Sequence, residues 1–185
     1  NIGHAVAQKC KLIGMNIIGV SRHGKDLNDV DQMVTQDVLD EVLPLADYIF
    51  MSTPNTKETY NLLDKRRQSL MKPGVGIINV GRAATMDYDA LVDNLNSGHI
   101  KAAIIDVFDP EPPQKDEPLL ELDNVILAPH ALCFTEQCIA GIGANDIRII
   151  LSVKQGEIPA GLVDPAVAES LIFRDKLEIY RDLFS

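Results

Sequence analysis

A guanidinium, a carboxylate and an imidazole occur in segments that follow short apolar runs of the chain. Arg82 comes after GIINV, Glu111 after AAIIDV and His130 after VIL. Hydride transfer to a ketone leaves an alkoxide that needs a proton, and histidine can donate one near neutral pH. A neighbouring carboxylate orients the imidazole, while an arginine can hold both oxygens of a substrate carboxylate. Each residue alone is more often a surface or packing residue. Together, beside a hydride donor, the three suit the reduction of a 2-keto acid.

The elements that must position these residues alternate along the chain. Short β-branched runs predict strands that are buried in a parallel sheet, and the stretches between them predict helices. We expect strands at Asn16–Val20, Asp47–Met51, Gly76–Val80, Ala102–Val107 and Val125–Leu127. We expect helices at Ile2–Leu12, Asp64–Leu70, Asp87–Leu95, Thr135–Val153 and Phe173–Phe184. This alternation predicts an α/β, Rossmann-like fold with a doubly wound parallel sheet, which binds ligands at the carboxyl ends of its strands.

The sequence begins with Asn1-Ile2-Gly3, at the start of a predicted helix. Dinucleotide-binding units place G-x-G-x-x-G between a strand and a helix, so that a pyrophosphate can approach the helix N-terminus. Asn1, Ile2 and Gly3 fit the last three positions of that motif, although a glycine there is more often simple packing. We therefore expect a fragment that begins inside the glycine loop and lacks the first strand of the sheet.

Ser21 and Arg22 follow the first predicted strand, close to the roughly 20-residue spacing from Gly3 at which such folds read the adenine ribose. An Asp or Glu there would bind a ribose 2′-hydroxyl and repel a 2′-phosphate. The hydroxyl of Ser21 and the guanidinium of Arg22, with His23 and Lys25 nearby, suit a phosphate dianion. We therefore expect NADP (as NADPH) rather than NAD; the alternative is a solvated basic turn.

Composition restricts the partners. The 185 residues are 46% hydrophobic and 24% charged, which is typical of a globular protein. A formal net charge of -10 repels a phosphate backbone, so we expect no nucleic-acid partner and no anionic membrane. The cysteines, Cys10, Cys133 and Cys138, fit neither a disulfide framework nor a zinc site. We therefore expect no metal and a reducing, cytoplasmic compartment.

Five motifs together resemble the NAD-binding domain of the D-isomer-specific 2-hydroxyacid dehydrogenases, from Asn1 to about Asp164. They are P-x-T-x-x-T at Pro54–Thr59, M-K-P-G at Met71–Gly74, N-x-x-R at Asn79–Arg82, D-V-F-x-x-E-P at Asp106–Pro112 and P-H-x-x-x-x-T at Pro129–Thr135. The resemblance implies that Arg82 binds substrate and that Glu111 and His130 form an acid–base dyad. It implies cofactor contacts from Asn1, Ile2, Gly3, Ser21, Arg22, Thr53, Pro54, Val80, Gly81 and Asp106, the last beside the nicotinamide carboxamide.

The resemblance further implies an oxidoreductase that transfers a hydride between NAD(P)H and a small 2-keto or D-2-hydroxy acid. Ser21 and Arg22 resemble the NADP-using branch, which includes glyoxylate and hydroxypyruvate reductases. Ala83 replaces the usual glycine after the arginine, and the residues that follow His130 differ from the commonest version. The alternatives are an NAD-dependent phosphoglycerate or D-lactate type dehydrogenase, a non-catalytic NAD(P)-sensing regulator, and a nucleotide-binding module without activity.

The same resemblance divides the chain into an NAD(P)-binding domain at residues 1–156 and a linker with a C-terminal segment at residues 157–185. Phe173–Phe184 is similar to a helix that closes a separate substrate domain. Family members usually dimerise through the nucleotide-binding domain, so a homodimer is expected. We expect a polypeptide that starts at Asn1 to fold poorly alone, because the absent strand would leave two unpaired sheet edges.

Overall fold

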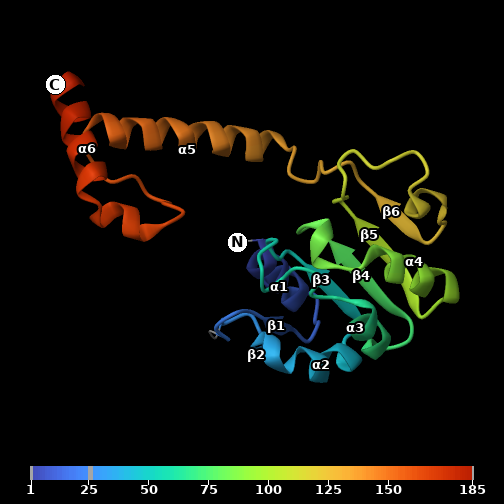
Figure 1. The fold of residues 1–185 in the computed structure, drawn as a ribbon. Coiled ribbons are helices and arrows are strands. Elements are labelled where there is room, and N and C mark those ends of the chain that lie inside the picture. Colours follow the sequence, from blue (N-terminus) through green and yellow to red (C-terminus); the bar gives the residue numbers. More distant parts are fainter. Residues whose placement is uncertain (1, 25–26, 185) are drawn as a thin grey trace. The chain divides into compact units, whose positions relative to one another are not determined.

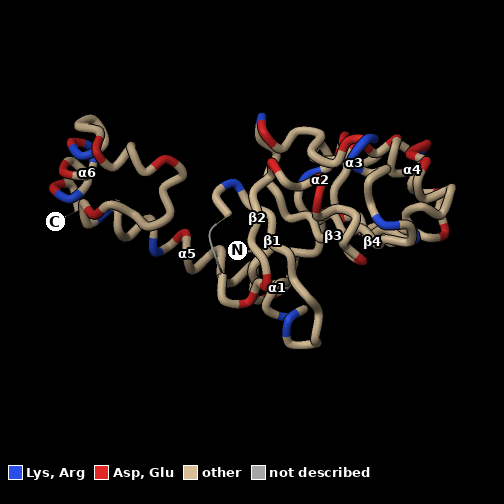
Figure 2. The backbone as a smooth tube through the Cα atoms, turned by 90° about the horizontal axis from the view of Figure 1, so that it is seen from below, with Lys and Arg blue, Asp and Glu red and all other residues tan. Residues whose placement is uncertain are grey.

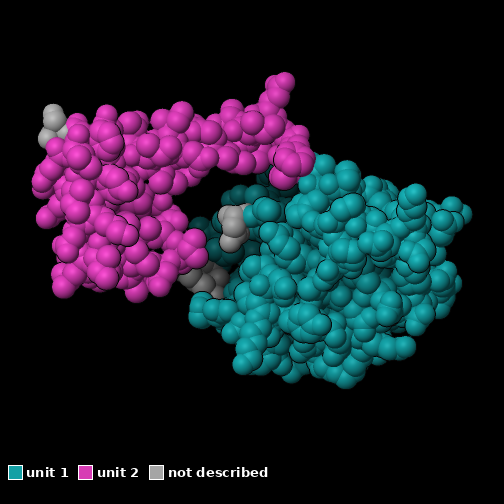
Figure 3. All heavy atoms as spheres, turned by 45° about the horizontal axis from the view of Figure 1, so that its top comes forward, with its two compact units in different colours: residues 1–132 teal, residues 133–185 magenta. Residues whose placement is uncertain are grey.

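The structure is a computed structural model that describes residues 2–24 and 27–184, and its chain forms two compact units, residues 1–132 and 133–185 (Figure 3). Unit 1 contains the strands β1 (Ile18–Val20), β2 (Gln32–Val34), β3 (Tyr48–Met51), β4 (Val75–Asn79), β5 (Ile100–Ile105) and β6 (Val125–Leu127) (Figure 1). Its helices are α1 (Ile2–Leu12), α2 (Leu39–Val42), α3 (Lys65–Leu70) and α4 (Tyr88–Ser97). Unit 2 contains α5 (Glu136–Lys154) and α6 (Leu171–Phe184). Short 3-10 turns lie at Gln36–Val38, Leu43–Leu45, Ala83–Thr85, Pro118–Glu121 and Pro165–Glu169.

The strands pair in parallel, as the alternation of strands and helices predicts. β3, β4, β5 and β6 form one sheet in that order, and β1 pairs with β2 in a second sheet. Met51 lies opposite Asn79, and Asn79 lies opposite Ile105, so the carboxyl ends of β3, β4 and β5 share one edge. Ligands bind at this edge in α/β folds.

Side-chain caps explain why α3, α4 and α5 begin where the sequence places them. The carboxylate of Asp64 accepts from Arg67 N at the start of α3, and that of Asp87 accepts from Ala90 N at the start of α4. The hydroxyl of Thr135 likewise accepts from Cys138 N at the start of α5. Such caps satisfy backbone N–H groups that have no partner inside the helix. Gly98, in the left-handed conformation, ends α4.

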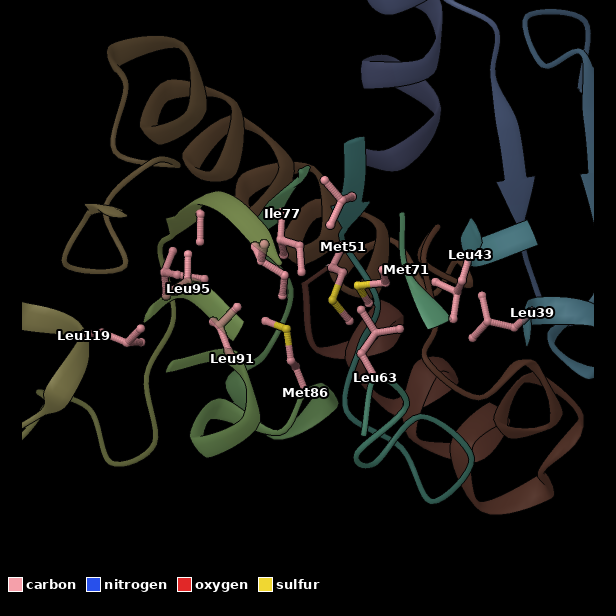
Figure 4. Close-up of a cluster of buried hydrophobic side chains, with 14 of the residues drawn as sticks. Leu39, Leu43, Met51, Leu63, Met71, Ile77, Met86, Leu91, Leu95 and Leu119 are labelled. Atoms are coloured by element: carbon pink, nitrogen blue, oxygen red, sulfur yellow. The ribbon is translucent and has the colours of Figure 1, made fainter. Parts of the chain in front are cut away.

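The core of unit 1 lies between the β3–β6 sheet and the helices α2, α3 and α4 (Figure 4). Its members include Leu43, Met51, Leu63, Ile77, Met86, Leu91 and Leu119. Gln68 is fully buried among them, and its amide nitrogen donates to the carbonyls of Leu63 and Asp87. The hydrogen bonds of Gln68 therefore tie α3 to the chain that leads into α4.

Helix α3 carries basic residues, whereas α2 and α4 on either side carry acidic ones (Figure 2). Arg66 and Arg67 of α3 both donate to the carboxylate of Asp40 in α2, at 2.6 and 2.8 Å. Lys65 lies 3.5 Å from Asp93 of α4, where both side chains are exposed. These ion pairs connect the three helices on the outside of the core.

A groove of about 900 Å³ separates β1 from β3. Helix α1 contributes Ile2 and Ala7 to its wall, β1 contributes Ile18 and Val20, and β3 contributes Tyr48 with the residues that follow it. Among the described residues no backbone pairing joins β1 to β3, so each strand keeps one unpaired edge. The side chain of Tyr48 is 64% exposed at that edge.

Two short elements of unit 1 lie outside the sequence prediction. β2 has three residues and α2 has four, too few for a periodic pattern to indicate either one. β2 forms because its backbone pairs with β1, and α2 forms because Leu39 and Val42 are buried in the core. Tertiary contacts, rather than local sequence, determine both elements.

Unit 2 begins with α5, whereas the sequence assigns residues up to 156 to the nucleotide-binding domain. That domain boundary stays a prediction, because compactness in space and membership of a domain are different properties. The stretch from Glu157, expected to be linker-like, contains a 3-10 turn at Pro165–Glu169, and the helix expected at Phe173–Phe184 is α6, which begins two residues earlier. Helix α6 packs against α5 and has Leu177 buried, and the Lys154 ammonium lies 5.1 Å from the centre of the Phe184 ring.

Candidate active site

The carboxyl edge of the sheet carries most of the predicted site. Beyond the strands, Val80 N donates to the Met51 carbonyl and Asp106 N donates to the Asn79 carbonyl, both at 3.0 Å. Ala128 N donates to the Ile105 carbonyl at 2.9 Å. The backbone pairing therefore continues past the strand ends and brings the segments after β3, β4, β5 and β6 to one rim.

Glu111 and His130 meet on this rim. Nδ1 of His130 lies 2.8 Å from Oε2 of Glu111, and both side chains are 39% exposed. The other carboxylate oxygen accepts from Phe108 N at 2.9 Å. The hydrogen bond from His130 lowers the pKa of Glu111, with further lowering by the Phe108 N–H and by the charge of Arg82. An ionised carboxylate fixes the proton of the imidazole on Nδ1 and leaves Nε2 for proton transfer.

Asp106 holds the backbone that follows His130. Its carboxylate accepts from Ala131 N at 2.9 Å and from Leu132 N at 3.4 Å, and its side chain is almost fully buried. His130 has a φ of 53°, in the left-handed region that histidine adopts more readily than most residues. Asp106 therefore stabilises the turn that presents the imidazole; its contact with a carboxamide stays a prediction.

Asn79 organises the turn that carries Arg82. The fully buried amide of Asn79 accepts from Gly81 N at 3.0 Å and lies 3.3 Å from the Arg82 carbonyl, to which it donates. Arg82 itself is exposed, and its Nη1 donates to the Gly81 carbonyl at 2.6 Å. In the sequence Asn79 stands out only as the first residue of the N-x-x-R motif. The signal for its structural role is a polar residue at the end of an apolar strand.

Gly81 and Gly3 mark close approaches of the backbone. A Cβ at Gly81 would lie 2.6 Å from the Thr53 carbonyl oxygen, and a Cβ at Gly3 would lie 2.9 Å from Oγ of Ser52. Both contacts are with residues that directly follow β3. A larger residue at Gly81 would push the turn after β4 away from the end of β3, because it would meet backbone atoms, whereas at Gly3 the side chain of Ser52 could rotate away.

The predicted cofactor residues divide into two groups. Six of them line the groove between β1 and β3: Ile2, Gly3, Ser21, Arg22, Thr53 and Pro54. Val80, Gly81 and Asp106 lie on the rim with the dyad instead. Asn1 lies outside the described residues, as does Lys25. A cofactor bound along both groups would extend from the end of β1 to His130.

Ser21 and Arg22 line this groove just beyond the end of β1. Oγ of Ser21 accepts from Gly24 N at 3.1 Å, so the hydroxyl shapes the turn after β1. Nη2 of Arg22 lies 3.4 Å from Oε2 of Glu58. The sequence does not predict this pair, because the two residues lie 36 positions apart.

Among residues 2–24 and 27–184, no group of three or more His, Cys, Asp or Glu side chains is arranged to hold a metal ion. Over the same residues, no helix combines the length and the apolar character that crossing a membrane requires.

Comparison with known proteins assigns the fold to a family. The family described as "D-isomer specific 2-hydroxyacid dehydrogenase, NAD binding domain" matches residues 1–131. The chain belongs to this family. The family and the Rossmann-like fold that the sequence motifs indicate are thereby confirmed.

Relatives of this 2-hydroxyacid dehydrogenase domain carry different substrate names. The chain is 37% identical to a glyoxylate reductase from Thermococcus onnurineus over 166 residues, which are 90% of this chain and 49% of that protein. It is 36% identical to a D-3-phosphoglycerate dehydrogenase from Methanocaldococcus jannaschii over 164 residues, which are 88% of this chain and 31% of that protein. The chain thus spans about half the length of the glyoxylate reductases that it matches.

A solved structure agrees with the family assignment. It is a D-isomer specific 2-hydroxyacid dehydrogenase from Xanthobacter autotrophicus Py2, in complex with NADPH and MES. It matches with a TM-score of 0.80 at 30% identity, over 89% of this chain and 67% of that chain.

Proposed function

We propose that this chain is the NAD(P)-binding part of an enzyme that transfers a hydride between NAD(P)H and a small 2-keto or D-2-hydroxy acid. The observation that carries the proposal is the 2.8 Å contact between His130 Nδ1 and Glu111 Oε2 on the rim where parallel strands end. Such a dyad can deliver a proton, which hydride transfer to a carbonyl requires. The family match to a NAD-binding domain supports the same reading.

The cofactor fits the residues that are present. A groove of about 900 Å³ is lined by Gly3 at the start of α1 and by Ser21, Arg22 and Thr53, which offer small, polar and cationic groups to a dinucleotide. Ile2 and Gly3 would hold the pyrophosphate at the start of α1, and Val80 and Gly81 would line the nicotinamide side. When bound, NAD(P)H supplies the hydride.

In the direction of reduction, the protein side chains act on the substrate carbonyl and its carboxylate. Arg82 binds the carboxylate and polarises the carbonyl through its guanidinium. Nε2 of protonated His130 donates its proton to the carbonyl oxygen as that oxygen gains negative charge. Glu111 stabilises the imidazolium before the transfer and keeps the ring in its orientation afterwards. In the oxidation of a 2-hydroxy acid the same groups act in reverse.

For the substrate we propose glyoxylate or hydroxypyruvate, with NADPH favoured over NADH. A serine and an arginine, rather than an acid, follow β1 and suit a 2′-phosphate. The name of the Thermococcus onnurineus relative, glyoxylate reductase, supports this substrate class. The NADPH in the Xanthobacter autotrophicus structure supports the cofactor.

The second candidate is an NAD-dependent dehydrogenase of the phosphoglycerate or D-lactate type. The M. jannaschii relative is named a D-3-phosphoglycerate dehydrogenase. A D-lactate dehydrogenase from Treponema pallidum matches with a TM-score of 0.76 at 28% identity. Both candidates use the same dyad, so substrate and cofactor kinetics distinguish them.

The test is cofactor oxidation by the full-length protein with glyoxylate, hydroxypyruvate, pyruvate and phosphohydroxypyruvate, using NADPH and NADH in parallel. We expect turnover of the first two acids with a preference for NADPH. His130→Asn should remove turnover and spare cofactor binding. Cofactor binding without turnover of any 2-keto acid would favour a sensor or an inactive module. A homodimer in the cytoplasm, proposed from the family resemblance alone, is tested by sedimentation of the same protein and by cell fractionation.

A further inference from the structure

The guanidinium of Arg22, the side chain proposed to hold a 2′-phosphate, already faces a carboxylate. Its Nη2 lies 3.4 Å from Oε2 of Glu58, which belongs to the loop after β3. The two side chains are 62% and 59% exposed, so a ligand can reach both. Any anion that binds Arg22 must therefore share this cation with Glu58 or displace it.

The loop holds Glu58 in place. Oγ1 of Thr56 donates to Oε2 of Glu58 at 2.7 Å. Thr59 is 5% exposed, and its hydroxyl donates to the Pro54 carbonyl at 2.6 Å and accepts from Thr56 N at 2.8 Å. The hydroxyl of Thr56, a backbone N–H and the charge of Arg22 together lower the pKa of Glu58. The carboxylate is therefore ionised at neutral pH and is oriented by a loop that is itself held by the partly buried hydrogen bonds of Thr59.

Glu58 also supplies the group that is absent from the end of β1. Dinucleotide sites that take NAD place an acid near the adenine ribose, where it accepts a hydrogen bond from the 2′-hydroxyl. In this chain Ser21 and Arg22 follow β1 and line the groove. The carboxylate comes from the loop after β3, whose residues Thr56 and Thr59 line the same groove, and it reaches Arg22 at 3.4 Å. A cation and an anion thus lie together at the position that reads the 2′ substituent.

We propose that Glu58 is a specificity-determining residue, whose carboxylate competes with the cofactor 2′-phosphate for Arg22 and so limits the preference for NADPH over NADH. The inference rests on the proposed binding of NADP(H) at Ser21 and Arg22. A 2′-hydroxyl carries no charge and does not need Arg22, whereas a 2′-phosphate can pair with Arg22 only by taking it from the Glu58 carboxylate. The Arg22–Glu58 pair therefore favours a site that accepts both cofactors.

The experiment compares two probes that differ only in the 2′-phosphate: adenosine 2′,5′-bisphosphate and AMP. Their binding to the full-length protein is measured by titration calorimetry for wild type, Glu58→Gln, Arg22→Gln and the double variant. Glu121→Gln is the matched control, because it changes the net charge equally at an exposed residue of the Pro118–Glu121 turn.

We expect Glu58→Gln to bind the bisphosphate about twofold to fivefold more tightly, the size expected when an exposed ion pair no longer competes for Arg22. AMP binding should not become tighter, and Glu121→Gln should behave as wild type. Added salt should reduce the gain, because exposed charges are screened. In the Arg22→Gln background, Glu58→Gln should produce less than half of this gain.

Three outcomes would overturn the inference. Bisphosphate affinity that is the same in Glu58→Gln and Glu121→Gln would show that the carboxylate does not affect the site; a loss of affinity in Arg22→Gln would then still support NADPH. If Glu58→Gln tightens bisphosphate binding by the same factor in the Arg22→Gln background, Glu58 acts by direct repulsion of the phosphate and not by competition for Arg22. An Arg22→Gln protein that binds the bisphosphate as tightly as wild type would refute both the cofactor preference and the competition.

Discussion

At the scale of single residues, Gly81 sets how closely the ends of β3 and β4 approach. A Cβ there would lie 2.6 Å from the Thr53 carbonyl oxygen and 2.9 Å from Thr53 N, and backbone atoms cannot rotate away. We predict that Gly81→Ala lowers the free energy of unfolding by about 1–3 kcal/mol, the range for overpacked sites. It should also weaken NADPH binding, because the Thr53 loop shifts.

Chemical denaturation and cofactor titration measure the two effects. Gly141→Ala is the control, because a Cβ at Gly141 meets nothing within 4 Å and alanine favours the helix. We expect that variant to be as stable as wild type or more stable. A Gly81→Ala protein with unchanged stability and unchanged NADPH affinity would contradict the close-approach argument.

The second prediction at the residue scale concerns Glu111. An amide in place of its carboxylate can still accept from His130 Nδ1 but cannot stabilise an imidazolium. We predict that Glu111→Gln lowers kcat about 100-fold, the size typical of acid–base catalysis, and leaves the Kd of NADPH unchanged. Stopped-flow reduction of glyoxylate and cofactor titration are the measurements. Wild-type kcat in this variant would remove Glu111 from the proposed mechanism.

The sequence predicts a site residue when that residue follows a strand or belongs to a motif. It does not predict which residues from distant segments come into contact in the fold. Arg82, Glu111 and His130 each follow a run that becomes a strand, and parallel strands end at one edge. Arg22 and Glu58 meet only because β1 and β3 line the same groove. No local sequence pattern indicates that these two side chains are in contact.

At the scale of secondary-structure elements, the sequence indicates helices that have local signals and misses a helix that depends on tertiary packing. The helices α3, α4 and α5 begin at the capping residues Asp64, Asp87 and Thr135, which are visible in the sequence. The short helix α2 has no side-chain cap and depends on Leu39 and Val42 in the core. Its existence follows from packing that the sequence does not display.

The ion pairs between α2 and α3 give a prediction on acid stability. Hydrogen bonds from Arg66 and Arg67 lower the pKa of Asp40 from 3.8 to about 2. Because the folded pKa lies below the unfolded one, this stabilisation is present above pH 4 and is lost as the pH falls toward 2. Asp40→Asn should therefore melt at a lower temperature than wild type at pH 7, and the two melting temperatures should converge between pH 4 and pH 2.

Thermal melts of both proteins across this pH range provide the measurement. Asp93→Asn, which removes the exposed pair with Lys65, is the control and should change the melting temperature little. A difference between Asp40→Asn and wild type that stays constant from pH 7 to pH 2 would mean that the carboxylate charge contributes nothing.

At the scale of the whole molecule, the groove between β1 and β3 limits the stability of unit 1, residues 1–132. Both strands keep an unpaired edge there, and the walls include the exposed side chains of Ile2 and Tyr48. Helix α1 has no fully buried residue among those described. Unpaired edges and exposed apolar surface favour association between chains and weaken cooperativity.

We therefore predict that a polypeptide of these 185 residues alone unfolds over a broad temperature range, binds a hydrophobic dye and aggregates at concentrations where the full-length protein does not. Differential scanning calorimetry, with the intact mass checked before and after, makes the comparison. The broad transition should come from α1, β1 and β2, while the β3–β6 sheet with its buried Ile77 and Leu91 persists longer. Hydrogen exchange can test this order directly, because amides of β4 and β5 should exchange more slowly than those of β1. A sharp melt without dye binding would show that the groove does not limit stability, and that packing of α1 across it is sufficient.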